Sequence, residues 1–256
     1  MRIMVLLTLI SLTISTFSQV KYIAHRGASF IAPENTMAAV NLAWQLNADA
    51  VEVDVYLSQD NQVMVCHDDT TLRTSGIKLV ISKSKAKLLR KLDVGSWKDH
   101  KYAGEKMPYL TEVINSVPEH KMLVVEIKCG KEILPYLKEI MDTTPKASQL
   151  VFISFGWETI LETKKTFPNN KCYWLSAENE GLSEKIKEAS QNKLDGINLY
   201  YEIISPSVIN LAKHYKLDVL CWTVDDPVEA KKLIKLGVSG ITTNRPAWLK
   251  EQVGRK

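Results

Sequence analysis

Short apolar, β-branched runs alternate with longer segments of helical periodicity along most of the chain. Runs of four to eight such residues are typical of buried strands, and apolar residues spaced by three and four are typical of helices. The pattern predicts strands at 21–24, 50–54, 122–127, 151–154, 172–175, 196–199, 219–223 and 240–243. Helices are expected over 36–46, 131–141, 157–166, 182–191 and 247–253, with two more after 205 and 226.

Two of these helices have explicit start signals. Ser205-Pro206 and Asp226-Pro227 each place a capping side chain before a proline at the first helical position. Gly237 is the kind of residue at which the second of these helices ends.

Eight strand–helix units in one chain of 256 residues predict a (β/α)8 TIM barrel. The alternative is an open, doubly wound sheet. The first predicted strand is not followed by the G-x-G-x-x-G turn that such dinucleotide-binding sheets carry. No break in composition divides the chain, so we expect a single barrel domain over 20–256.

The run at 63–66 departs from the alternation, because it follows Asp54 too closely for a parallel crossover. We therefore expect an antiparallel hairpin that extends the second strand, with a two-residue turn at Asp60-Asn61. This register places His67 opposite Asp54, on the same face of the sheet. The polar stretch 67–120, with expected helices at 84–91 and 110–116, is predicted to be a short insertion before the third barrel strand.

The first nineteen residues resemble a secretory signal peptide rather than part of the fold. Arg2 is their only charge, and an apolar stretch over 3–14 leads into small polar residues. That stretch is shorter than the roughly 20 apolar residues of a membrane span. We expect an exported protein, periplasmic or secreted, with no stable membrane insertion once 1–19 are removed.

Composition and charge indicate an ordinary folded protein with no nucleic-acid partner. The chain is 45% hydrophobic, and its 33 basic and 29 acidic residues give a net charge of only +4. Its four cysteines form no C-x-x-C pair, so a zinc knuckle is not indicated. All four are expected to be free thiols.

Charged residues gather where the first three barrel strands end, which is where barrel enzymes carry their sites. These residues, with one contributed by the hairpin, are His25, Arg26, Glu52, Asp54, His67, Glu126 and Lys128. Acids that face a barrel interior need a compensating cation. Arg26 and Lys128 are one candidate, and a divalent metal is the better one. An all-oxygen donor set suits Mg²⁺ or Ca²⁺.

A metal beside an arginine and a lysine favours a phosphate group as ligand. Two histidines nearby supply a general acid and a general base that titrate close to neutral pH. The residues therefore predict cleavage of a phosphoester.

With these motifs the chain resembles the glycerophosphodiester phosphodiesterases, which are related in fold and mechanism to phosphatidylinositol-specific phospholipase C. The resemblance spans His25 to Pro246 and is specific through the order and spacing of its motifs. These are His25-Arg26-Gly27, Ala32-Pro33-Glu34-Asn35-Thr36, Glu52-x-Asp54, His67-Asp68, Gly104-Glu105 before Met107-Pro108-x-Leu110, Glu126-x-Lys128, Trp222-Thr223-Val224-Asp225 and Gly240 through Asn244-Arg245-Pro246.

The resemblance implies a role for each matching residue. Glu52, Asp54 and Glu126 would hold one divalent metal. His25 and His67 would be the acid–base pair, with the order between them open. Arg26 and Lys128 would neutralise the phosphate. Glu34 would contact substrate hydroxyls or support Arg26, and Trp222 would form a wall of the pocket. The implied products are sn-glycerol 3-phosphate and an alcohol.

The sequence is also compatible with three other functions. A lysophospholipase D-type enzyme on the same barrel would need an apolar groove or loop near its mouth, and the stretch 67–120 is mostly polar. A non-catalytic binder of phosphorylated glycerol compounds would not need both histidines. A glycoside hydrolase uses paired carboxylates but has little need for two histidines and two cations.

Overall fold

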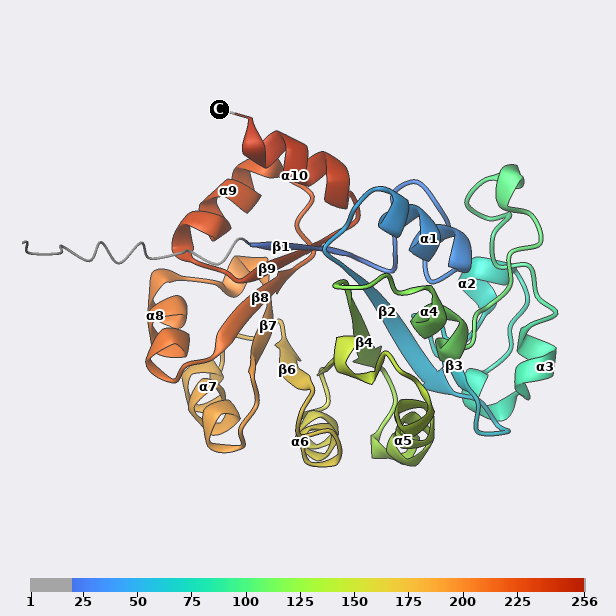
Figure 1. The fold of residues 1–256 in the computed structure, drawn as a ribbon, viewed down its shortest axis with the longest axis horizontal. Coiled ribbons are helices and arrows are strands. Elements are labelled where there is room, and N and C mark those ends of the chain that lie inside the picture. The colour runs from blue at the N-terminus through green and yellow to red at the C-terminus, as the bar shows by residue number, and fades with distance from the viewer. Residues whose placement is uncertain (1–19, 256) are drawn as a thin grey trace, which may run out of the picture.

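The computed structural model describes residues 20–255, and the predicted signal segment 1–19 lies outside them. Within this range eight parallel strands close into a barrel, because β1 pairs with both β9 and β2 (Figure 1). The strands are β1 Lys21–Ala24, β2 Ala50–Leu57, β4 Met122–Ile127, β5 Leu150–Ser154, β6 Lys171–Ser176, β7 Gly196–Tyr200, β8 Asp218–Trp222 and β9 Gly240–Thr243. The predicted (β/α)8 barrel is confirmed, and the open doubly wound sheet is excluded.

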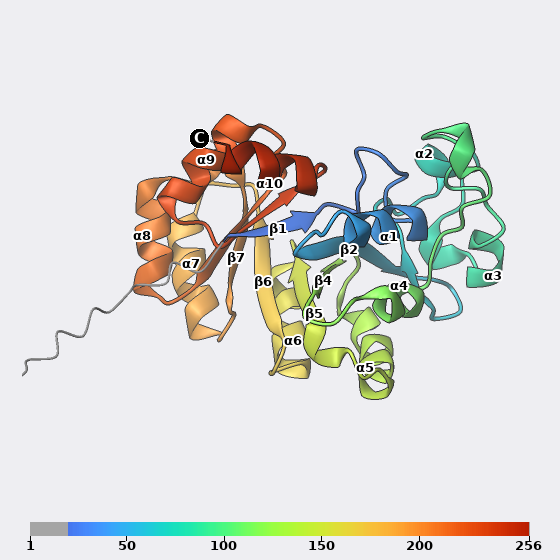
Figure 2. The same ribbon diagram turned by 45° about the horizontal axis from the view of Figure 1, so that its top comes forward.

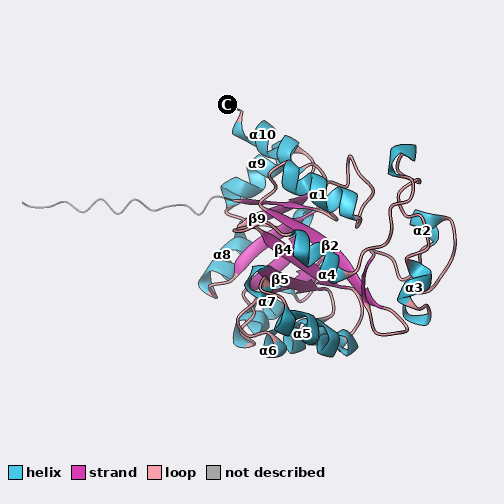
Figure 3. Cartoon of the chain, turned by 45° about the vertical axis from the view of Figure 1, so that its right-hand side comes forward, coloured by secondary structure: helices cyan, strands magenta, loops and turns pink. Residues whose placement is uncertain are grey.

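Helices surround the strands (Figures 2 and 3). They are α1 Met37–Gln45, α4 Leu110–Ser116, α5 Leu134–Thr143, α6 Trp157–Thr166, α7 Leu182–Gln191, α8 Pro206–His214, α9 Pro227–Leu236 and α10 Pro246–Gly254. The predicted caps are present, because the side chains of Ser205 and Asp226 accept hydrogen bonds from the amides of Val208 and Val228. These elements lie within a few residues of the sequence prediction.

Alternating side chains on each strand face two different cores. One set packs outward against the helices, as do Ile197 and Leu199 of β7. The other set fills the barrel interior. The buried members of that inner core are Ile23, Ala50, Val124, Val151, Ile153, Tyr173, Leu175 and Leu220. The buried cluster inside the barrel is apolar. Polar side chains that point inward near the carboxyl ends of the strands are therefore candidates for a functional site.

The hairpin is present, but its predicted register is wrong by one residue. Strand β3, Val63–Val65, runs antiparallel to β2. The Cys66 amide donates to the Asp54 carbonyl, so Cys66 rather than His67 lies opposite Asp54. The loop has three residues because Asn61 adopts a left-handed φ of 61° and its amide donates to the Ser58 carbonyl. His67 reaches the barrel mouth because the chain leaves the sheet after Val65.

The insertion between β3 and β4 forms a small lobe beside the barrel, on the right of Figure 1. The lobe contains α2 Leu72–Ser75 and α3 Ala86–Leu89. Helix α4, at the end of the insertion, instead packs on the barrel and buries Leu110, Val113 and Ile114 in the outer core. Ile81, Leu89 and Met107 of the insertion form a separate buried cluster with Met64 of β3. The helix expected over 84–91 is shorter than predicted, whereas the helix at 110–116 has the predicted bounds.

The described residues include no helix that is long and apolar enough to span a membrane. The four cysteines are free thiols, as the sequence predicts, and Cys66, Cys172 and Cys221 are buried.

Candidate active site

A pocket of about 100 Å³ opens at the carboxyl ends of the barrel strands. Six of the nine sequence-predicted site residues line it on one side, namely His25, Arg26, Glu52, His67, Glu126 and Lys128. Trp222 lines it on the other side, together with Phe155, Leu175 and Asn198. Of the remaining two, Asp54 lies beside Glu52 and Glu126, and Glu34 stands behind Arg26.

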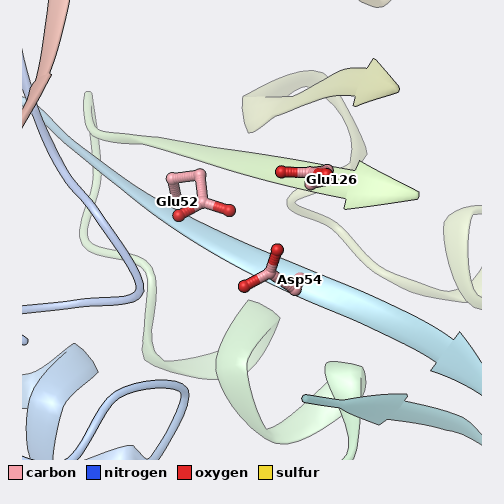
Figure 4. A group of neighbouring side chains, drawn as sticks. All are labelled: Glu52, Asp54 and Glu126. Atoms are coloured by element: carbon pink, nitrogen blue, oxygen red, sulfur yellow. The ribbon is translucent and has the colours of Figure 1, made fainter. Parts of the chain in front are cut away.

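Three carboxylates converge at this pocket (Figure 4). Glu52 and Asp54 come from β2 and Glu126 from β4, and one oxygen of each lies within 4.8 Å of the others. Burial, followed by the charges of Asp54 and Glu126, raises the pKa of Glu52 well above its usual value. Burial and the charge of Asp54 raise the pKa of Glu126 to about 7. Such crowding of like charges is stable when a cation lies between them.

Two fixed cations neutralise part of this charge. Lys128 Nζ lies 2.8 Å from Glu126 Oε1 and 3.7 Å from Asp54 Oδ1. Arg26 Nε lies 3.4 Å from Asp54 Oδ2 but makes no hydrogen bond. Glu52 Oε1 is buried and has no hydrogen-bond partner in the described chain. The protein's own cations therefore leave one buried carboxylate oxygen uncompensated, and the all-oxygen cluster fits a hard divalent cation.

The turn after β1 explains why arginine and glycine follow His25. Arg26 and Gly27 have left-handed φ values of 55° and 82°. A Cβ atom at Gly27 would lie 2.6 Å from the backbone of Ala39, so only glycine fits there. This geometry allows the Arg26 amide to donate to Glu52 Oε2 at 2.8 Å. The turn thus positions an acid on the neighbouring strand.

His25 is held by the side-chain amide of Asn244, and Asp225 fixes the orientation of that amide. Asn244 Nδ2 donates to Asp225 Oδ2 at 2.6 Å, so its Oδ1 faces His25 Nδ1 at 2.8 Å. Ser29 Oγ also donates to that Oδ1. His25 therefore carries its hydrogen on Nδ1, which leaves Nε2 as the basic nitrogen. Burial and the nearby Arg26 charge lower the pKa of His25, which favours the neutral ring.

His67 has a different partner. Its Nδ1 lies 2.6 Å from Asp68 Oδ1, and Asp68 Oδ2 accepts from Arg73 Nε at 2.7 Å. Partial burial opposes ionisation of Asp68, but the hydrogen bonds from Arg73 and His67 lower its pKa to about 2. One predicted acid–base histidine therefore pairs with a neutral amide and the other with a carboxylate.

Comparison with known proteins places this arrangement in a family. The sequence model of the glycerophosphoryl diester phosphodiesterase family matches residues 25–248. The chain belongs to this family. A glycerophosphodiester phosphodiesterase from Caldanaerobacter subterraneus subsp. tengcongensis is 33% identical over 232 residues, covering 89% of this chain and 95% of that protein. The protein is accordingly a glycerophosphodiester phosphodiesterase.

Solved structures of similar proteins share the barrel. A phosphodiesterase from Oleispira antarctica, in complex with the product sn-glycerol-3-phosphate, has a TM-score of 0.85 and 27% identity, covering 92% of this chain and 97% of that one. A further relative is similar in sequence over a shorter stretch. This lysophospholipase D from Homo sapiens is 33% identical over 119 residues, which cover 44% of this chain and 38% of that protein.

Several residues that organise the site of this phosphodiesterase are absent from the sequence-predicted set. Asn35 donates from Nδ2 to Asp54 Oδ2 at 2.8 Å, and its Oδ1 accepts from the Asp54 amide. Its φ of 56° is one that asparagine tolerates better than most residues. Asn35 belongs to the Pro-Glu-Asn-Thr motif, so the sequence contained a signal for it.

Arg73 on α2 links the insertion to the site. It donates from Nη1 and Nη2 to both oxygens of Glu34, at 2.9 and 2.8 Å, and also contacts Asp68. No spacing or motif in the sequence singles it out. Burial opposes ionisation of Glu34, but hydrogen bonds and charges from Arg73 and Arg26 lower its pKa to about 2.

Of the two roles expected for Glu34, the geometry of this phosphodiesterase favours support of Arg26. Glu34 Oε1 accepts from Arg26 Nη1 at 2.8 Å, and the side chain does not line the catalytic pocket. Trp222 does line the pocket, where its ring packs edge-on against Phe155 with centroids 5.4 Å apart.

Proposed function

We propose that the protein is a metal-dependent phosphodiesterase that hydrolyses glycerophosphodiesters to sn-glycerol 3-phosphate and an alcohol by acid–base catalysis with two histidines. The observation that carries this proposal is the convergence of three buried carboxylates, two fixed cations and two histidines on one small pocket. Family membership supports the substrate class.

Glu52, Asp54 and Glu126 would hold one divalent metal, either Mg²⁺ or Ca²⁺. The buried and unpartnered Glu52 Oε1 supports a cation at this position. When bound, such a metal supplies positive charge that polarises a phosphate oxygen and favours ionisation of a coordinated hydroxyl. The oxygen-only donor set argues against zinc, because all four thiols lie outside the cluster.

His25 fits the role of general base. With its hydrogen on Nδ1 facing Asn244, its Nε2 can accept the proton of a glycerol hydroxyl. The hydroxyl oxygen then attacks phosphorus, and a cyclic phosphate forms as the bond to the alcohol breaks.

His67 fits the role of general acid. Asp68 holds its Nδ1, so its Nε2 is left to give a proton to the departing alcohol oxygen. Water then opens the cyclic phosphate with the two histidines in exchanged roles, so that His67 takes a proton from water and His25 returns one to the glycerol oxygen.

Arg26 and Lys128 line the pocket beside the carboxylates and would stabilise the negative charge on the phosphoryl oxygens. Preorganised donors of this kind typically contribute about 2.7–4 kcal/mol each to transition-state stabilisation. Their ion pairs with the acids hold them in place before substrate binds.

The proposal is tested by measuring glycerol 3-phosphate release from a panel of choline, ethanolamine, inositol and glycerol diesters. The protein is first stripped with EDTA and then assayed with no metal, with Mg²⁺ and with Ca²⁺. We expect release only with a metal, and the preferred diester identifies the alcohol. No release with any metal would contradict the proposal.

A second candidate substrate is a lysophospholipid, and one observation favours it. A groove of about 330 Å³ beside the β1–α1 loop is lined by apolar side chains that include Phe30, Ile31 and Trp248. Phe30 and Ile31 are about half exposed. The groove could accommodate an acyl chain, so lysophosphatidylcholine belongs in the panel, and its hydrolysis in preference to the deacylated diesters would favour this candidate.

We further propose that residues 1–19 direct export and are cleaved near 16–19, so that the enzyme acts in the periplasm or outside the cell. The support is the sequence pattern of a single basic residue followed by an apolar stretch. Mass spectrometry of the protein from a producing culture tests this proposal, because an intact Met1 on all molecules would contradict it.

A further inference from the structure

Within residues 20–255, three buried side-chain atoms have no hydrogen-bond partner, and all belong to residues that line the catalytic pocket. Two of them, Arg26 Nε and Glu52 Oε1, belong to the charged side already described. The third is Oδ1 of Asn198, on the opposite side of the barrel. Leaving such an atom unpaired in a buried position costs free energy, so it marks a place where a ligand supplies the missing partner.

Asn198 occupies a position where the barrel otherwise carries apolar side chains. Its neighbours Ile197 and Leu199 point outward into the helix-facing core, so Asn198 points into the barrel. Its register partners on β6 and β8 are Leu175 and Leu220, which both belong to the inner apolar core. An amide between two leucines, in a residue only 1% exposed, has no packing reason to be there.

The closed barrel sets Asn198 across the pocket from the carboxylates. In the strand order β1-β9-β8-β7-β6-β5-β4-β2, with β1 also paired to β2, β7 lies diametrically opposite β2. Glu52 lies on β2 and Asn198 on β7, and both line the same pocket of about 100 Å³. A ligand whose phosphate contacts the charged side therefore extends its other end toward Asn198.

We infer that the Asn198 amide hydrogen-bonds a hydroxyl of the glycerol part of the substrate and thereby selects for glycerol esters. A hydroxyl both donates and accepts, so it satisfies an amide in either orientation. The pocket is small and Asn198 is buried, which suits the three-carbon glycerol unit rather than a departing alcohol of variable size. Trp222 Nε1 donates to the Asn198 carbonyl at 3.2 Å, which holds the tryptophan over the same part of the pocket.

This inference rests on the proposed function, and the chain offers a matched control for it. Asn170, just before β6, donates from Nδ2 to the carbonyls of Ala147 and Leu150, both at 2.8 Å. It lies at the amino end of the strands, away from the pocket. Asn170 is therefore a structural amide, whereas Oδ1 of Asn198 has no hydrogen-bond partner among residues 20–255.

The test compares the wild type with Asn198→Leu, Asn198→Ala and Asn170→Leu, each loaded with Mg²⁺. Calorimetry measures the affinities for sn-glycerol 3-phosphate and for n-propyl phosphate, which has the same carbon chain without hydroxyls. We expect the wild type to prefer sn-glycerol 3-phosphate. Both Asn198 variants should lose about tenfold of that preference, equivalent to about 1.4 kcal/mol, because only the hydroxylated ligand loses a partner.

Thermal unfolding separates binding from structure. Asn198→Leu should leave the melting temperature unchanged or raise it, because it removes an unpaired buried polar group. Asn170→Leu should lower the melting temperature and keep the ligand preference. Asn198→Ala guards against the case in which leucine obstructs the pocket, since it removes the amide without adding bulk.

An undiminished preference in both Asn198 variants would overturn the inference and leave water as the partner of the amide. A wild type that binds the two phosphates equally would overturn it as well. Neither result would bear on the proposed reaction, which is judged separately by glycerol 3-phosphate release from diesters by the wild type.

Discussion

The two sides of the catalytic pocket differ in how their polar side chains are held. On the side of β1, β2, β4 and the hairpin, nearly every charged group has a defined partner, as in the links from Arg26 through Glu34 and Arg73 to Asp68. On the side of β5 to β8, the walls are leucine and aromatic side chains, with Asn198 unpartnered among them.

This difference indicates that the two sides of the pocket have different functions. Proton transfer and charge stabilisation need groups held within a fraction of an ångström, and a surrounding network provides this. The opposite wall needs only to shape the cavity and to recognise a glycerol hydroxyl other than the one that attacks phosphorus. Substitutions on the networked side should therefore affect turnover, and those on the apolar side should affect affinity.

The largest effect should come from removing the metal. EDTA treatment should abolish activity and lower the melting temperature, because the buried carboxylates then repel one another, and Mg²⁺ or Ca²⁺ should restore both. In Glu52→Gln, added metal should raise the melting temperature much less. Full activity after exhaustive chelation and dialysis would refute the metal assignment.

Replacing either histidine should have the next largest effect. His25→Ala and His67→Ala should each lower kcat by about 10²–10⁴-fold, the usual contribution of a general acid or base. Circular dichroism should show an intact barrel in both. Loss of folding in both variants would instead make the histidines structural and would remove the distinction between the two sides.

Arg73→Gln should have a moderate effect on activity, because it removes the link that orients Glu34 and Asp68. Arg255→Gln, which breaks only an exposed helix pair with Glu251, is the control and should leave activity unchanged. A wild-type rate in Arg73→Gln would show that the insertion plays no part in positioning the site.

The same variant should change the response to acid. In the folded protein Arg73 helps to lower the pKa of Glu34 from 4.5, and that of Asp68 from 3.8, to about 2. The stability from these groups is present above their unfolded pKa values and is lost as pH falls toward 2. Unfolding midpoints between pH 6 and 2 should therefore fall less steeply in Arg73→Gln than in the wild type. Equal slopes would contradict this assignment.

The smallest effect should come from the apolar wall. Trp222→Phe keeps an aromatic ring but removes the Nε1 hydrogen bond to the Asn198 carbonyl. We expect KM to rise by a few fold with kcat nearly unchanged, the pattern of lost uniform binding. Steady-state kinetics measure both, and a large fall in kcat would contradict the proposed division between the two sides.

Much of the fold could be predicted because its signals are local. Strand and helix periodicity, caps and prolines placed the elements to within a few residues, as at 157–166 and 182–191. The motifs also placed most of the charged side of the pocket. The hairpin register could not be predicted, because it depended on the left-handed conformation of Asn61, and two- and three-residue loops fit the same residues.

The sequence by itself determined the barrel class, the strands that carry the acids, and the residues that match the family. Tertiary structure alone decided what those residues touch. His25 and Asn244 are 219 positions apart and meet because β1 pairs with β9. Arg73 meets Glu34 across 39 positions, and Asn198 faces Glu52 only because the barrel closes. Local periodicity reflects short-range backbone preferences, whereas these contacts depend on strand order and closure, which no local pattern encodes.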